Sequence, residues 1–75
     1  MGDDRYIVVA GDVLDLANDP DIDVIDRLEV VLLARTTPER STQLSSRHDV
    51  VVSVYASEDL ARIAFDLFRQ EQDRR

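Results

Sequence analysis

The sequence contains two strand-like segments that are apolar on both faces, and this limits the possible folds more than any other feature. Residues 28–35 and 49–56 are rich in β-branched and aliphatic residues. Neighbouring residues of a strand point to opposite faces, so even-numbered and odd-numbered positions form separate faces. Both are apolar here. The even face holds Leu28, Val30, Leu32, Ala34, Val50, Val52, Val54 and Ala56, and the odd face holds Val31, Leu33, Val51 and Tyr55.

A C-terminal helix is the element that we expect to cover this sheet. Ser57 can cap its first turn, where Glu58 and Asp59 also suit the helix dipole. Its apolar residues cover an arc of about 200°, wider than the usual core-facing stripe of about 100°. These residues are Leu60, Ala61, Ile63, Ala64, Phe65, Leu67 and Phe68.

We expect this helix to cover the even face and to leave the odd face exposed. Four large apolar side chains left in water would forgo roughly 1.5–3 kcal/mol each, which is comparable with the stability of a small domain. The sequence therefore predicts a protein interface at Val31, Leu33, Val51, Tyr55 and Phe65. Curling of the sheet, or a hairpin of residues 5–16 folded across it, would cover the odd face equally well.

The remaining segments complete a single α+β domain over residues 1–75. Residues 5–10 read as a strand, Gly11 and Asp12 as a hairpin turn, and residues 13–16 as a short returning strand. Residues 20–26 fit a strand or a helix, and residues 36–48 read as a long polar loop. The predicted fold is a four- or five-stranded antiparallel sheet with the C-terminal helix packed on one face.

The charge of the chain lies entirely in its first half. Residues 1–34 contain nine acids and two arginines, whereas residues 35–75 contain seven of each, so the net charge of −7 belongs to the first half. An acidic rim is expected at Asp12, Asp15, Asp19, Asp21, Asp23 and Asp26. This charge disfavours direct binding to nucleic acid or to an anionic membrane and favours a basic protein surface. A solvated rim that serves only solubility is the alternative.

The sequence offers no convincing catalytic or metal-binding motif. Asp19, Asp21 and Asp23 have the spacing that starts a calcium loop, but Val24 and Val30 stand where that loop needs Gly and Glu. Ser45, Ser46, His48 and Asp49 are the residue types of a hydrolase triad, but they lie within one short segment. There is no Cys. We therefore expect neither enzymatic activity nor a cofactor or metal.

The chain resembles short uncharacterised proteins of bacteria and their phages, some of which have a pleckstrin-homology-like sheet closed by one helix. The resemblance rests on Tyr-Ile-Val-Val-Ala at residues 6–10, Gly-Asp at 11–12, and Val-Tyr-Ala-Ser-Glu-Asp-Leu-Ala at 54–61 running into a terminal helix. It implies no catalytic residue and no known activity. Because no apolar run could span a membrane and no signal peptide is apparent, a cytoplasmic protein is expected, in the host cytoplasm if the chain is phage-encoded.

The sequence predicts a non-enzymatic module that binds another protein and forms a homodimer. Small acidic phage inhibitors of host nucleases, the anti-CRISPR proteins among them, suggest one mode, in which the acidic rim docks on a basic, nucleic-acid-binding protein and blocks it. A structural or antitoxin-like partner of one cognate protein is the alternative. The sequence contains no apolar run long enough to span a membrane and no signal peptide, so no membrane association is expected.

Overall fold

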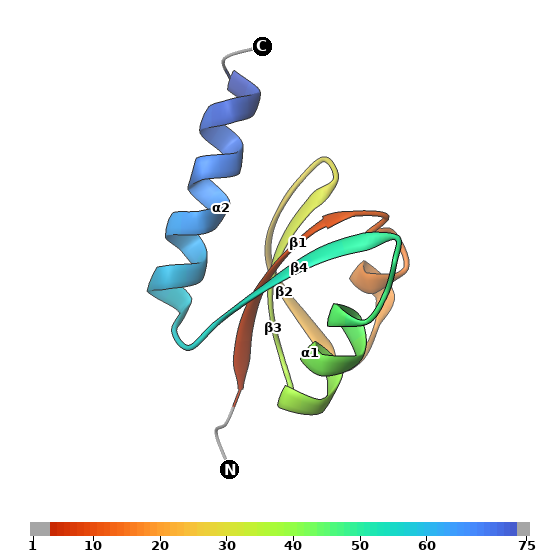
Figure 1. Cartoon of the computed structure of the whole chain (residues 1–75). Coiled ribbons are helices and arrows are strands. Elements are labelled where there is room, and N and C mark those ends of the chain that lie inside the picture. Colours follow the sequence, from red (N-terminus) through yellow and green to blue (C-terminus); the bar gives the residue numbers. More distant parts are fainter. Residues whose placement is uncertain (1–3, 74–75) are drawn as a thin grey trace.

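The computed structural model describes residues 4–73 and contains one four-stranded antiparallel sheet with helices on both sides (Figure 1). In the sheet the strands lie in the order β2-β3-β1-β4. The elements are β1 (Arg5–Gly11), the 3₁₀-helix η1 (Leu16–Asn18), β2 (Ile22–Leu28), β3 (Val31–Thr36), α1 (Pro38–Ser45), β4 (Val50–Tyr55) and α2 (Glu58–Asp73). The predicted α+β class, with an antiparallel sheet and a C-terminal helix, is confirmed.

The two central strands are buried on both faces. In β1, Ile7 and Val9 pack on one face of the sheet and Val8 on the other, and all three are almost completely inaccessible. The four residues Val31–Ala34 of β3 are also all buried. Such continuous apolar strands require a covering layer on each side of the sheet.

The even-numbered face, which is named for the residues of β3 and β4 that it carries, is covered by η1 and α1. In β1, the odd-numbered residues lie on this face. Leu16 and Leu44 from these helices, together with Val13, join Ile7, Val9, Leu32 and Ala34 in one core. Residues 36–48 were expected to be a polar loop, and this prediction is wrong. Thr37 caps α1 by accepting a hydrogen bond from the Arg40 backbone N–H at 3.2 Å, and Pro38 occupies the first turn.

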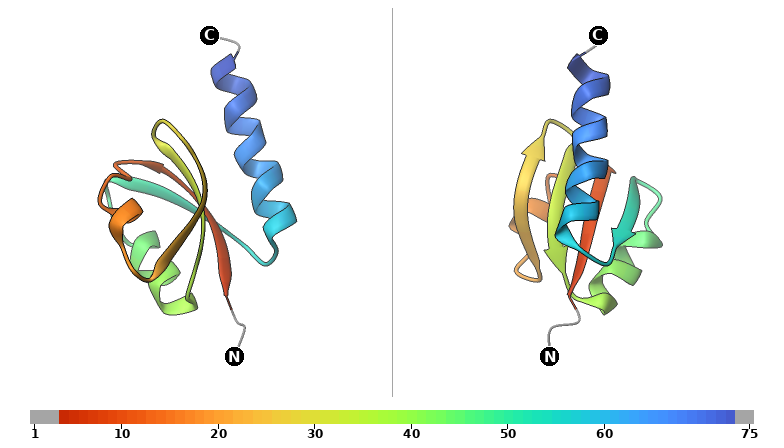
Figure 2. Two further views of the ribbon diagram at one scale, coloured as in Figure 1. Left: turned by 180° about the vertical axis from the view of Figure 1, so that it is seen from behind. Right: turned by 90° about the vertical axis from the view of Figure 1, so that its left-hand side faces the viewer.

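The odd-numbered face is covered by α2, as both views in Figure 2 show. Phe65 and Ala61 of this helix pack on Val8, Val31 and Leu33. The expectation that the C-terminal helix covers the even face is therefore wrong. The predicted N-cap is confirmed, since Ser57 Oγ accepts a hydrogen bond from the Leu60 N–H at 3.3 Å.

The predicted hairpin at Gly11 and Asp12 is also wrong. Gly11 does have a positive φ, of 122°, but it ends β1 beside the backbone of Asp49, and a Cβ there would lie 2.5 Å from the Asp49 carbonyl oxygen. Residues 13–16 lead through a turn into η1, which begins at Leu16, and do not form a returning strand. Val13 and Leu16 are buried there, so their apolar character serves the core beneath α1.

Residues 20–26, which fitted both a strand and a helix, fall mostly in strand β2. This edge strand is irregular, because its register against β3 shifts between Val24 and Asp26. A turn at Glu29 and Val30 connects it to β3, with Glu29 at a φ of 51°. The predicted strand over residues 28–35 therefore begins three residues later, at Val31. Within residues 4–73, neither α1 nor α2 combines the length and apolar content that a membrane-spanning helix needs.

We predict that Leu44→Ala destabilises the protein by about 2–5 kcal/mol, because it leaves a cavity in the core beneath α1. Leu44 is fully buried, whereas Leu14 is 66% exposed. The control Leu14→Ala should therefore change the free energy of unfolding by less than about 0.5 kcal/mol. Urea denaturation of both variants measures the difference. Equal stability of the two variants would show that α1 does not form part of the core.

Candidate functional site

The most distinctive exposed feature is an apolar surface shared by α2 and β4, here called the α2–β4 surface. It consists of Val51 and Tyr55 on β4 and Leu60, Ile63, Leu67 and Phe68 on α2. Val51 is 71% exposed, and the helix residues from Leu60 to Phe68 are 52%, 60%, 57% and 37% exposed. Single exposed apolar residues are ordinary, but a contiguous group marks an interaction site.

The geometry of α2 explains why this surface is left open. Ala61 and Phe65 point into the core, while Leu60, Ile63 and Leu67 recur at helical spacing along a neighbouring flank. The apolar arc of the helix is therefore wider than the sheet can cover.

An ion pair on the opposite flank shows which way α2 is turned. Arg69 reaches Asp26 on β2 at 3.5 Å and lies 5.7 Å from the centre of the Phe65 ring. This flank therefore faces β2. The apolar flank consequently faces the other edge of the sheet, where β4 lies.

A groove of about 310 Å³ separates this flank of α2 from β4. Its lining is mostly apolar, with one carboxylate, and consists of Ser53, Tyr55, Ala64, Leu67, Phe68 and Glu71. Ser53 and Tyr55 project from the face of β4 that α2 does not fully cover. The groove and the exposed flank form one continuous site that suits an apolar protein segment.

The five predicted interface residues divide between this site and the core. Val51 is exposed and Tyr55 lines the groove, as expected of interface residues. Val31, Leu33 and Phe65 are buried within the chain itself because α2 covers the odd face, so their predicted role at an interface is wrong. Sequence reasoning missed Leu60, Ile63 and Leu67, although the unusually wide apolar arc of the helix was the signal that marks them.

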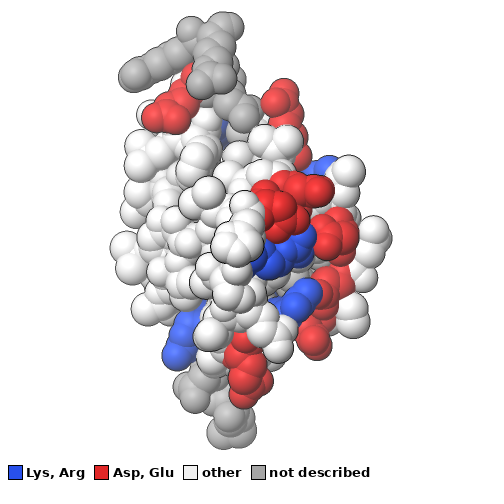
Figure 3. Space-filling view, turned by 45° about the vertical axis from the view of Figure 1, so that its right-hand side comes forward, with Lys and Arg blue, Asp and Glu red and all other residues white. Residues whose placement is uncertain are grey.

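The acidic rim is largely neutralised by arginines. Asp12, Asp15, Asp19 and Asp21 belong to the connection between β1 and β2, and Asp23 and Asp26 lie on β2. Four of the six form ion pairs: Asp15 with Arg47, Asp19 with Arg40, Asp23 with Arg35, and Asp26 with Arg69. Figure 3 shows the acidic side chains gathered along one side of the molecule with arginines among them. Among the described residues, Asp12 and Asp21 have no such pair.

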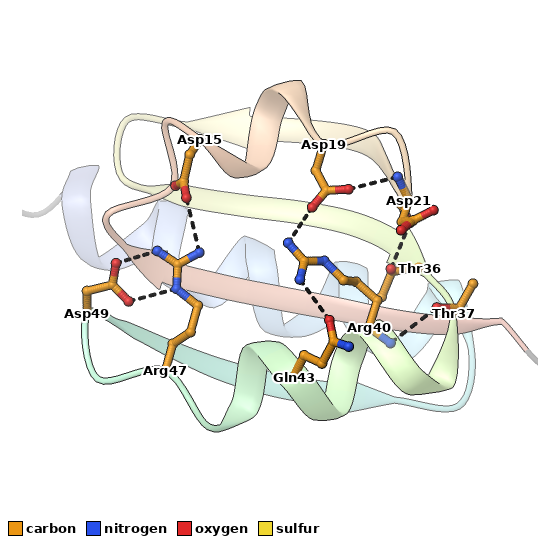
Figure 4. Close-up of polar contacts among 9 residues, drawn as sticks. All are labelled: Asp15, Asp19, Asp21, Thr36, Thr37, Arg40, Gln43, Arg47 and Asp49. Atoms are coloured by element: carbon orange, nitrogen blue, oxygen red, sulfur yellow. Dashed lines mark hydrogen bonds and ion pairs between the residues drawn. The ribbon is translucent and has the colours of Figure 1, made fainter.

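Arg40 and Arg47 connect α1 to the residues on either side of η1 and to the start of β4 (Figure 4). Arg40 on α1 binds the carboxylate of Asp19 and donates to Gln43 at 2.9 Å. Arg47, just after α1, binds Asp49 and reaches Asp15 at 3.2 Å. These two arginines therefore hold η1, α1 and the start of β4 together.

These contacts shift the pKa values of two carboxylates. The backbone N–H of Asp21 donates to Asp19 at 2.8 Å and, with Arg40, lowers the pKa of Asp19 although partial burial opposes the shift. The Arg47 guanidinium lowers the pKa of Asp49. Both carboxylates are thus held in the charged form, which suits structural ion pairs more than proton transfer.

The candidate triad residues do not converge on one another. The hydroxyl of Ser45 donates to the Ser41 carbonyl and that of Ser46 to the Gln43 carbonyl, while Asp49 binds Arg47. His48 is exposed. In the described part of the chain, no group of three His, Cys, Asp or Glu side chains is arranged to hold a metal ion.

Comparisons with protein-family models, with curated proteins and with solved structures found no match to this chain. The resemblance to short bacterial and phage proteins therefore remains a prediction.

We predict that Asp19→Asn lowers the midpoint of urea unfolding at neutral pH but not at acidic pH. The folded-state pKa of Asp19 is depressed, so its charge stabilises the fold above the ordinary carboxyl pKa of about 4. This contribution disappears as the pH falls through the lower folded-state value. The difference between wild type and variant should therefore shrink below about pH 4.

The exposed Asp12 supplies a matched control, since Asp12→Asn removes a rim charge without breaking an ion pair among the described residues. Its unfolding midpoint should stay close to that of the wild type throughout. A deficit of Asp19→Asn that persists undiminished to pH 3 would assign the effect to packing and contradict the electrostatic explanation.

Proposed function

We propose that this chain is a non-enzymatic protein-interaction module that binds through its α2–β4 surface. The observation that carries the proposal is the exposed apolar flank of α2 beside a groove, on a molecule whose two sheet faces are otherwise covered by its own helices. Several apolar side chains at one place support association driven by burial of apolar area. Of the two roles expected from the sequence, this favours a structural or antitoxin-like partner of one cognate protein.

Docking of the acidic rim on a basic protein is the second candidate. It is supported by the net charge of −7, because nine arginines cannot neutralise sixteen acids even if every one is paired. If the partner binds nucleic acid, the rim would inhibit it by competition for its basic surface. Against this candidate stand the ion pairs that occupy four of the six rim aspartates.

Salt dependence separates the two candidates. Between about 0.1 M and about 1 M salt the Debye length falls from about 10 Å to about 3 Å, which weakens rim docking and leaves apolar burial intact. We predict that affinity capture of the partner from source-cell lysate by the tagged chain persists at high salt. The double variant Ile63→Gln, Leu67→Gln should abolish the capture, since both side chains are exposed and belong to the apolar flank.

The matched control is Asp12→Asn, Asp21→Asn, which removes the two rim charges without ion pairs among the described residues. It should capture the partner as well as the wild type does. Capture that is lost at high salt and in this control, but kept in the Ile63 and Leu67 variant, would overturn the proposal in favour of the rim.

A further inference from the structure

We infer that the α2–β4 surface pairs with the same surface of a second copy of this chain, and that the two β4 strands join into one continuous sheet. The inference rests on the proposed function, and it identifies the cognate protein that binds this surface as a second copy of the chain. It is carried by the edge strand β4, by the orientation of its backbone groups and by the direction in which the apolar flank of α2 faces.

The two edges of the sheet differ in how they are protected. Edge strands commonly avoid pairing with other chains by means of charged residues, proline or a bulge. Strand β2 has the sequence Ile-Asp-Val-Ile-Asp-Arg-Leu, with three charges and a register shift. Strand β4 is Val-Val-Val-Ser-Val-Tyr, with no charge, no proline and no register shift against β1. Only β4 is therefore suited to accept another strand.

The hydrogen-bond register shows which backbone groups of β4 face outward. Asp12 N–H donates to the Asp49 carbonyl at 3.2 Å, which continues the β1–β4 register as a hydrogen-bonded pair. Hydrogen-bonded pairs recur at every second residue of an antiparallel ladder. Val51, Ser53 and Tyr55 therefore bond to β1, whereas the N–H and C=O groups of Val50, Val52 and Val54 point to the open edge.

A two-fold axis perpendicular to the sheet brings both features together. It places the two β4 strands antiparallel, and it keeps the two α2 helices on the same face of the joined sheet. Because the apolar flank of α2 faces the β4 edge, the flanks of the two helices then face each other across the axis. One symmetry operation thus pairs the outward backbone groups and covers the exposed side chains.

The side chains of β4 favour one register, with Ser53 on the axis. In that register Val52 and Val54 of the two copies form hydrogen-bonded pairs. Val51 then lies opposite Tyr55 of the partner subunit, on the face that carries α2. A β-branched residue opposite an aromatic one is a favourable cross-strand pair. This pairing would also cover Val51, the most exposed residue of the surface.

The exposed area is close to what such a dimer needs. With about 150–200 Å² for each fully exposed residue of this size, Val51, Leu60, Ile63, Leu67 and Phe68 together expose roughly 400–550 Å². Complete burial of these residues in both copies would remove about twice that area from water. This total approaches the roughly 1,000 Å² at which specific interfaces begin, and the groove lining and strand backbone add to it.

Cysteine cross-linking tests the register directly, because the chain has no cysteine of its own. On the axis, a Ser53→Cys pair would have Cα atoms about 4.5 Å apart, within the range of a disulfide. The control Val51→Cys lies on the same face of the same strand, but its two copies would be about 13 Å apart along the strands. After oxidation with diamide, we expect a covalent dimer for Ser53→Cys and a monomer for Val51→Cys. Equal cross-linking of the two variants, or none, would overturn the register.

Light scattering and analytical ultracentrifugation test the association without a cross-link. We expect a concentration-dependent mass that approaches twice the 8.5 kDa of the chain. Val54→Pro removes an outward N–H and leaves the bonds to β1, a position where an edge strand tolerates proline. It should weaken the dimer by at least about tenfold, whereas Val54→Thr keeps the shape and the N–H and should change it by less than about threefold. Circular dichroism checks that both variants fold.

The outcomes separate this inference from the function on which it rests. A wild-type chain that stays monomeric at all concentrations, with lysate capture still sensitive to Ile63→Gln and Leu67→Gln, would overturn the dimer and leave the proposed function standing. A monomer that also captures no protein would overturn both. A dimer that is weakened equally by Val54→Pro and Val54→Thr would contradict pairing through the β4 edge.

Discussion

The structure depends on one constraint, which is that the two central strands are apolar on both faces. With Ile7, Val8 and Val9 of β1 and Val31–Ala34 of β3 all buried, neither face of the sheet can remain in water. The chain meets this requirement with three layers: η1 and α1 on one side, the sheet in the middle and α2 on the other. The long polar segment between β3 and β4 supplies part of this cover as helix α1, despite its composition.

The covering layer of η1 and α1 is small, and the arginine pairs make up for its few apolar contacts. From α1 only Leu44 belongs to the apolar core, so packing alone holds the helix weakly. Arg40 and Arg47 bridge it to Asp19, Asp15 and Asp49, with Asp19 largely shielded from water. Shielded, hydrogen-bonded pairs are more strongly coupled than exposed ones. Of the acidic rim, the shielded Asp19 is thus part of the scaffold, whereas the side chains of Asp15 and Asp23 are mostly exposed.

Local sequence was sufficient to predict β1, β4 and the C-terminal helix, since strand propensity and the Ser57 cap are local signals. It was also sufficient to predict that the sheet is apolar on both faces. It was insufficient for α1, whose single core leucine gives no helical periodicity, although Thr37, Pro38 and Glu39 form a recognisable helix start. The face that α2 covers depends on contacts distant in sequence, and both faces are apolar. For that reason Val31 and Leu33 were assigned to an interface, and Leu60 and Ile63 to no site.

Once both faces are covered, the edges of the sheet decide how the molecule can associate. The β2 edge is protected by Asp23, Asp26 and Arg27 and by its register shift, so it does not readily accept a strand. The proposed pairing of two copies through β4 would consume both unprotected edges and leave a β2 strand at each end of the joined sheet. Growth would then stop at two copies, because an isologous contact closes on itself, whereas two open edges would allow a fibre. The asymmetry between β2 and β4 is thus the feature that makes a defined dimer compatible with so short and apolar a sheet.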